Sequence, residues 1–166
     1  MGLRFQLTPD QKPSNFIIHV LLNDADAQLQ QETVGIIGTN MLHACFNETD
    51  PKEILKQLYD NLSKDKVQID MIEVLGPAFD KVDNRLLSLT LVKERMTNAV
   101  IFTPDGMNQH PSDILYKKNI ITIRGSFRPV TKVNIDMLER GLKEFKKNSK
   151  VKEENIQLLF EITLSN

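Results

Sequence analysis

The stretch Phe16-Ile17-Ile18-His19-Val20-Leu21-Leu22 decides the fold class that the sequence predicts. It is a near-continuous apolar run rich in β-branched residues, which is typical of a strand buried on both faces. From about residue 27 to residue 46 the period of the apolar residues changes to that of a helix. The residues of this helical stripe are Val34, Ile37, Met41, Ala44 and Cys45. A buried strand followed by an amphipathic helix indicates an α/β protein.

The rest of the chain repeats this alternation. A second helix is expected from the N-cap Asp50 to about Leu62, and a later helix begins after the N-cap Thr131. Besides a short extended segment at 3–7, the further expected strands are 67–75, 98–103, 119–124 and 155–164. Because strands that alternate with helices form parallel sheets, we expect one mostly parallel sheet of about five strands. Helices on both of its faces would make a Rossmann-like three-layer sandwich.

The segment from residue 83 to residue 96 carries two conflicting signals. Its leucines alternate with other residues, as in a strand, at Leu87, Leu89 and Leu91. Asp83 is nevertheless a good N-cap, and Lys93-Glu94-Arg95 would form a charged last turn. Since parallel strands need a crossover between them, we expect a helix here that crosses over in the right-handed sense.

Length, charge and cysteine content exclude several classes of protein. With 166 residues the chain suits a single α/β domain over residues 1–166. A net charge of -1 provides no basic surface for nucleic acid, and no apolar run approaches the length of a membrane helix. The single cysteine, Cys45, cannot form an internal disulfide, which favours a cytoplasmic location. The segment 161–166 ends without a polar tail, so we expect a fragment of a longer protein.

The loop before the last expected helix is the strongest candidate for a binding site. Arg124, Ser126 and Arg128 lie just before the expected helix start at Thr131. Helix N-termini bind anions through free N–H groups, and arginine donates paired hydrogen bonds to phosphate or carboxylate. These residues therefore predict an anion-binding loop. The alternative is that both arginines form ion pairs with acids of neighbouring loops and only tie those loops together.

Two other polar loops follow expected strands, and in a parallel sheet they would open at the same edge. Asp83, Asn84 and Arg85 end the first loop, and Asp105-Gly106 lies in the second. Asp83 and Asp105 are candidate catalytic residues, while Asn84 and Arg85 are candidate ligand-binding residues. The alternatives are that Asp83 only caps a helix and that Asp105-Gly106 only forms a turn.

The three histidines provide no metal-binding motif. His19 lies in an apolar strand and His43 on a core helix, and neither has a second ligand at metal-binding spacing. Both are therefore expected to be structural. His110 lies on the candidate edge and suits an acid or a base, but the sequence offers it no partner. We expect no metal site, and no motif selects a cofactor.

A set of segments forms a specific pattern: residues 2–7, 16–40 with Leu29-Gln30-Gln31-Glu32-Thr33-Val34-Gly35, 76–79, 82–85, 97–99, 115–118 and 124–131. Together they resemble an interior part of a family of larger bacterial proteins, whose members are often labelled TonB-dependent receptor or nicotinate or nicotinamide mononucleotide adenylyltransferase. The resemblance covers nearly the whole chain and implies that Met1-Gly2 is an internal position. None of the three histidines lies in an HxGH-type motif, and we carry neither activity over to this chain.

We expect an enzyme domain, or part of one, that binds a phosphorylated or carboxylated small molecule of a nucleotide-like kind. The competing hypothesis is a non-catalytic interaction module that packs against the remaining segments of the full-length protein. In an enzyme the arginines of 124–131 would surround an open pocket, whereas in a module they would be buried in ion pairs. Both hypotheses leave the oligomeric state open.

Overall fold

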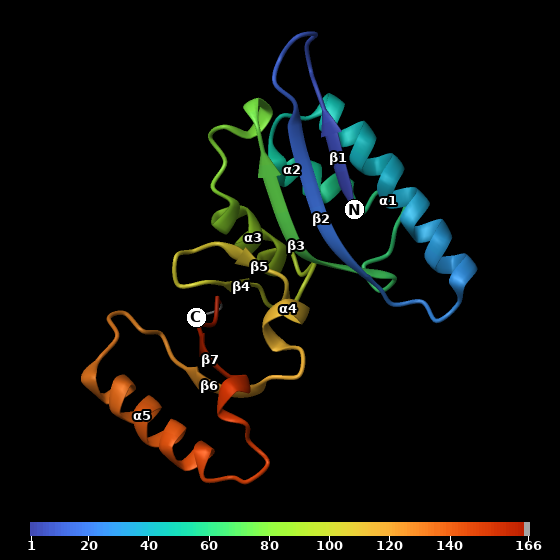
Figure 1. Cartoon of the computed structure of the whole chain (residues 1–166). Helices are drawn as coiled ribbons and strands as arrows, with labels where there is room; N and C mark the ends of the chain where they lie inside the picture. The colour runs from blue at the N-terminus through green and yellow to red at the C-terminus, as the bar shows by residue number, and fades with distance from the viewer. Residues whose placement is uncertain (165–166) are drawn as a thin grey trace. The chain divides into compact units, whose positions relative to one another are not determined.

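The two long strands, β2 (Ser14–Leu22) and β3 (Val67–Leu75), lie side by side and run antiparallel. β1 (Gly2–Phe5) pairs antiparallel with the other edge of β2, which gives a three-stranded sheet of order β1-β2-β3. Figure 1 shows the computed structural model of the chain, which describes residues 1–164. By its internal contacts the chain divides into unit 1, Met1–His110, and unit 2, Pro111–Asn166.

Two of the predictions for the whole chain are left open by this structure. The single-domain prediction stays a prediction. The expectation of a fragment rests on the segment 161–166, whose last two residues lie outside the described residues.

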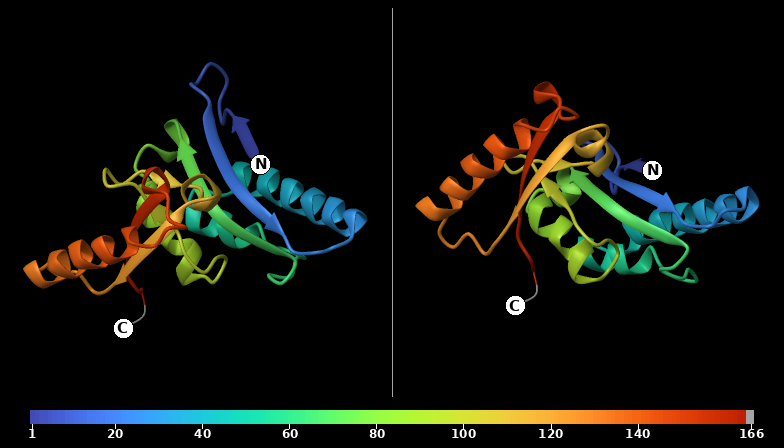
Figure 2. Two further views of the ribbon diagram at one scale, coloured as in Figure 1. Left: turned by 60° about the horizontal axis from the view of Figure 1, so that its bottom comes forward. Right: turned by 90° about the horizontal axis from the view of Figure 1, so that it is seen from below.

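Three helices cover one face of the sheet of unit 1: α1 (Ala27–Asn47), α2 (Pro51–Gln57) and α3 (Asn84–Lys93) (Figure 2). Each helix begins after an aspartate that accepts backbone hydrogen bonds: Asp26, Asp50 and Asp83. The side chains that form the core between sheet and helices include Phe16, Ile18, Ile37, Ile54, Leu55, Ile69, Ile72, Val74, Leu87 and Leu91. Burying an apolar side chain of this size contributes roughly 1.5–3 kcal/mol, so this contact surface holds unit 1 together.

The prediction of one mostly parallel, Rossmann-like sheet is wrong. The physical reason lies in the connection between β2 and β3. A single helix between two strands returns the chain to the starting end of the sheet and makes the strands parallel. Here α1 returns the chain, and α2 with the loop after it carries the chain back again (Figure 1). β3 therefore starts at the end where β2 stops, and the two strands are antiparallel.

The predicted helix over 83–96 is confirmed as α3, with Asp83 as its N-cap. The crossover expected from it is wrong, because β3 and the segment after α3 belong to different sheets. That segment, predicted as a strand over 98–103, contains only β4 (Ile101–Phe102), which pairs antiparallel with β5 (Asn108–Gln109). The turn at Pro104-Asp105-Gly106, where Gly106 has a φ of 85°, closes this hairpin before the chain can extend into a long strand.

The outer edge of β3 is completed by side chains and by the backbone carbonyl of Met96, which accepts from the N–H of Ile69 at 3.1 Å, rather than by another strand. The side-chain amide of Asn84 accepts from the N–H of Val74 at 2.9 Å and donates to the carbonyl of Val74 at 3.0 Å. The side chain of Asn108 donates to the carbonyl of Ile72 at 2.9 Å. These contacts satisfy backbone groups that would otherwise be buried without partners. After β3 the short 3-10 helix η1 (Pro77–Phe79) adds Phe79 to the core.

Unit 2 contains one β-α-β element. β6 (Asn119–Arg124) and β7 (Ile156–Glu161) pair in parallel, and α5 (Lys132–Lys146) lies between them in the sequence. The short helices α4 (Pro111–Leu115) and η2 (Glu153–Asn155) precede β6 and β7. The strand predicted over 119–124 is confirmed, and the strand predicted over 155–164 is shorter than expected. None of the helices in the described part of the chain combines the length and the apolarity that crossing a bilayer requires.

Replacing Asn84 with alanine tests how the edge of β3 is held. The variant loses both bonds to Val74, so we expect the free energy of unfolding to fall by about 2–3 kcal/mol in chemical denaturation. Asn47→Ala is the control, because Asn47 is exposed and makes one bond to the carbonyl of His43 at 2.8 Å. That control should lose less than about 0.5 kcal/mol. Equal losses in the two variants would contradict the edge role and favour the predicted ligand-binding role of Asn84.

Candidate metal site

A β-bulge in β3 brings Asp70 against His19. The register between β2 and β3 passes from His19↔Met71 to Val20↔Ile69, so Asp70 and Met71 together lie opposite His19. The buried apolar positions of β3 are Val67, Ile69, Ile72 and Val74. The core-facing phase of the strand therefore shifts by one residue at the bulge. As a result the carboxylate of Asp70 contacts His19 instead of the apolar core.

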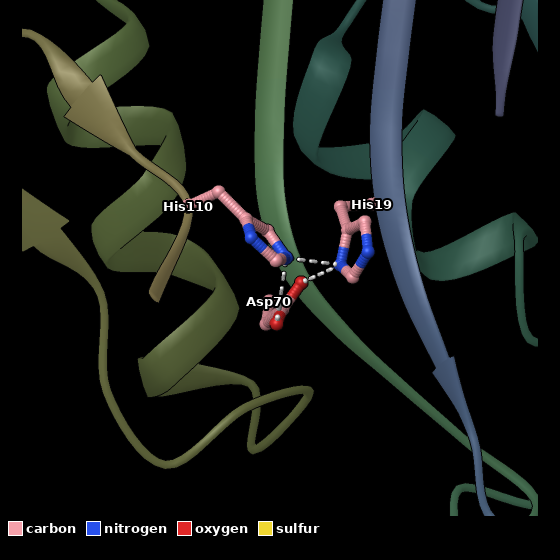
Figure 3. Close-up of side chains that lie close together, drawn as sticks. All are labelled: His19, Asp70 and His110. Carbon is pink, nitrogen blue, oxygen red and sulfur yellow. Dashed lines mark hydrogen bonds and ion pairs between the residues drawn. The ribbon is translucent and has the colours of Figure 1, made fainter. Parts of the chain in front are cut away.

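His19, Asp70 and His110 form one cluster of side chains (Figure 3). His19 Nδ1 lies 2.6 Å from Asp70 Oδ1 and 2.8 Å from His110 Nε2. Asp70 Oδ2 lies 3.7 Å from His110 Nε2. The three residues come from β2, from β3 and from the position directly after β5, and their polar atoms point toward one another.

A single proton satisfies this arrangement poorly. His19 Nδ1 offers either one N–H or one lone pair, yet both Asp70 Oδ1 and His110 Nε2 lie within 2.8 Å of it. If Nδ1 carries a proton, this one N–H must be shared between the carboxylate and a bare Nε2 of His110, which leaves both hydrogen bonds poorly aligned. If Nδ1 is bare, it accepts from His110 and faces the carboxylate oxygen with no proton between them. A cation bound by all three groups removes this conflict.

The donor set and its spacing fit a transition-metal ion. Two imidazoles and one carboxylate are a known ligand combination for Zn²⁺ and Fe²⁺. Ligand atoms that lie about 2.0–2.1 Å from a tetrahedral ion are roughly 3.3 Å from one another. The three donor atoms of this cluster all lie within 4.8 Å of one another. Small side-chain movements are therefore enough to bring them around one ion.

The cluster is buried on one side and open on the other. The side chain of Asp70 is 4% exposed, that of His110 is 17% exposed and that of His19 is 37% exposed. The carboxylate thus forms the base of the site, and His19 reaches solvent. An ion held here by three protein ligands would remain accessible to water and small molecules.

The two other residues of interest on α1 take no part in this cluster. Cys45 is buried in the core, as expected from the sequence, and burial raises the pKa of its thiol to about 12. The neutral thiol is a poor metal ligand and a poor nucleophile. His43 is exposed on α1, so it serves as a control histidine outside the site.

In unit 1 the structure brings together several residues that the sequence predicted as a site. Asp83 accepts from the backbone N–H of Arg85 at 2.9 Å and pairs with its guanidinium at 2.9 Å. These hydrogen bonds from Arg85 lower the pKa of Asp83 to about 2. The Arg85 side chain also lies within 4 Å of the place where a Cβ on Gly106 would stand. Asp105 accepts from the hydroxyl of Thr103, which lowers the pKa of Asp105.

These contacts confirm the helix cap at Asp83 and the turn at Asp105-Gly106. The amide of Asn84 is engaged with the backbone of β3. The catalytic roles of Asp83 and Asp105 and the ligand-binding roles of Asn84 and Arg85 stay predictions.

The remaining predicted site residues lie in unit 2: Arg124, Ser126, Arg128 and Thr131. Arg124 pairs with Glu161 at 2.7 Å, and both side chains are exposed. Thr131 is the N-cap of α5 and forms a capping box with Asn134. Arg128 is exposed and has no ion pair within the part of the chain that the structure describes. The arginines are therefore not buried clamps, and their anion-binding role stays a prediction.

Sequence reasoning missed the cluster because its members are distant in the chain. Asp70 is 51 residues and His110 is 91 residues from His19, so no local spacing connects them. A weak signal was present in β3, where apolar residues keep a period of two through Val67, Ile69 and Met71 and a second apolar series begins out of phase at Ile72. Such a change of phase is compatible with a bulge, but it does not by itself single out Asp70.

Comparisons with known proteins provide no relative for this chain, so the functional argument rests on the geometry of His19, Asp70 and His110. No protein family, no curated protein and no solved structure matches the chain. The resemblance to the bacterial family described above stays a prediction.

The Asp83–Arg85 pair makes a prediction about acid stability. The pKa of Asp83 is about 2 in the folded chain and about 3.9 for an unperturbed aspartate. Its stabilising contribution is therefore complete above about pH 4 and is lost as the pH falls toward 2. Asp83→Asn keeps a capping side chain but removes the charge. We expect wild type to be more stable than this variant near neutral pH, with the difference vanishing toward pH 2. A difference that stays constant over this range would contradict the assignment.

Arg128→Ala tests the alternative that the arginine is a structural clamp. Because Arg128 is exposed, we expect the free energy of unfolding to change by less than about 0.5 kcal/mol. Lys118→Ala is the matched control, since Lys118 is also exposed. A loss of about 3–5 kcal/mol for Arg128→Ala alone would reveal a buried ion pair and favour the interaction module.

Proposed function

We propose that unit 1 is a metal-dependent enzyme domain that binds a divalent transition-metal ion through His19, Asp70 and His110. The observation that carries this proposal is the convergence of two ring nitrogens and a carboxylate on one point, with contacts of 2.6 Å and 2.8 Å that a single N–H would have to share. Groups arranged in this way relieve their conflict by sharing a cation.

The number of ligands supports a catalytic centre over a structural one. Structural zinc sites are closed by four protein ligands, whereas catalytic sites use three and keep a position for water or substrate. The cluster contains three potential ligands among the described residues, and the 37% exposure of His19 leaves it open to solvent. An ion such as Zn²⁺ in this setting lowers the pKa of bound water to about 7 and polarises a bound oxygen.

Charge favours an anionic ligand at the open position. A divalent ion, one carboxylate and two neutral imidazoles leave a net charge of about +1 at the site. An oxygen of a phosphorylated or carboxylated small molecule fits such a centre, in agreement with the ligand class inferred from the sequence. Hydrolysis of an ester of this class is the reaction that we propose, because it needs only water and the bound ion.

Metal binding is tested by isothermal titration of the full chain with Zn²⁺, together with thermal unfolding. We expect one ion per chain and a rise in stability, which at a free concentration of 100 times Kd amounts to about 2.7 kcal/mol. His19→Ala, Asp70→Asn and His110→Ala should each remove this binding. His43→Ala should leave it unchanged, because His43 is an exposed histidine outside the cluster. Unchanged binding in Asp70→Asn would refute the site.

The enzymatic part of the proposal needs a separate assay. The Zn²⁺-loaded chain should hydrolyse p-nitrophenyl phosphate or a p-nitrophenyl ester that carries a free carboxylate faster than the same chain treated with a chelator, and Asp70→Asn should abolish the difference. Zn²⁺ binding with no hydrolysis of either class would restrict the cluster to a non-catalytic metal site and favour the interaction module.

A further inference from the structure

We infer that Asn108 is a positioning residue for the metal ligand His110, and that the ion and the β4–β5 hairpin hold each other in place. This inference rests on the metal site proposed above. It adds a residue that touches no ion and a change in the chain that metal binding brings about.

The β4–β5 hairpin is weakly held by apolar packing. Its strands are two residues long each, and although Val100 just before β4 packs against the core, no residue from 98 to 110 is fully buried. Isolated two-stranded hairpins are only marginally stable in water, and segments with few buried side chains open at low free-energy cost. The hairpin therefore depends on the polar contacts near its end.

Two successive contacts connect the end of the hairpin to β3: the hydrogen bonds of Asn108 and the contact between His110 and Asp70. The side chain of Asn108 donates to the carbonyl of Ile72 at 2.9 Å and to the carbonyl of Asn84 at 3.3 Å. Two residues further along, His110 Nε2 lies 3.7 Å from the carboxylate of Asp70. Side chains two positions apart in an extended chain lie on the same side. The contact of Asn108 with β3 therefore positions His110 beside Asp70.

Closure of the β4–β5 hairpin and metal binding are thermodynamically linked. If the hairpin opens, the ion loses one of its three ligands, so the apparent affinity for metal scales with the fraction of closed hairpin. By reciprocity, a bound ion shifts the hairpin toward the closed state by the same factor. The chain enters unit 2 at the residue after His110, and a bound ion thus fixes the point at which the chain leaves unit 1.

The first measurement is the affinity of the full chain for Zn²⁺ in two asparagine variants. Asn108→Ala removes the hydrogen bonds of the Asn108 side chain to the carbonyls of Ile72 and Asn84. It should weaken Zn²⁺ binding about 10- to 100-fold, the usual effect of losing a residue that orients a metal ligand. Asn40→Ala is the matched control, because Asn40 donates to two carbonyls of unit 1, those of Leu58 at 3.1 Å and Asp60 at 2.8 Å. Equal Zn²⁺ affinities of Asn108→Ala and wild type would overturn the positioning role, as would an equal loss in Asn40→Ala.

The second measurement is hydrogen exchange of the full chain with and without Zn²⁺. Amides of residues 98–110 should exchange at least about tenfold more slowly with the ion bound, whereas α1 should change less. Asp70→Asn should show no such protection. Saturating Zn²⁺ should restore the protection of the hairpin in Asn108→Ala, since excess ion compensates for weaker binding.

The outcomes separate this inference from the proposed function. If Zn²⁺ binds with one ion per chain and Asp70→Asn abolishes binding, but residues 98–110 exchange equally fast with and without the ion, the coupling is refuted and the metal site stands. If no Zn²⁺ binds to wild type, the metal site and the inference both fail.

Discussion

Backbone groups along the outer edge of β3 need hydrogen-bond partners, and no strand of the described chain supplies them on that side. Asn84, Asn108 and Met96 supply them instead. The start of α3, the segment after α3 and the β4–β5 hairpin are therefore each fastened to the same edge. His110 follows the last of these contacts directly, so its place beside Asp70 depends on how this edge is completed.

The β-bulge in β3 determines which side chains of this strand face the core and which face His19. Without the bulge, a strict alternation of side chains would continue through Asp70 and keep Ile69 and Ile72 on opposite faces. The bulge lets both pack in the core and leaves Asp70 opposite His19. The same local change thus serves the apolar core and the proposed metal site, and the core fixes the carboxylate at the base of the cluster.

Whether two strands joined by helices are parallel or antiparallel depends on how many times the connecting helices cross the length of the sheet. α5 is a single passage, and β6 and β7 are parallel as the β-α-β rule requires. α1 and α2 together make two passages, and β2 and β3 are antiparallel. Both helices were predicted from the sequence. That α1 and α2 run in opposite directions along the sheet, and so make two passages, is a feature of the tertiary structure.

The sequence by itself determined the position of most helices and long strands, because capping residues and apolar periods act within a few residues of each other. Asp83 is the N-cap of α3, as predicted, although the leucines of that helix alternate as in a strand. Val67–Leu75 forms a strand with the predicted bounds. Only the tertiary structure decided strand pairing, the place of the hairpin and the meeting of His19, Asp70 and His110. Those features depend on register, on the bulge and on edge contacts between residues far apart in the chain, and local spacing carries no information about such distances.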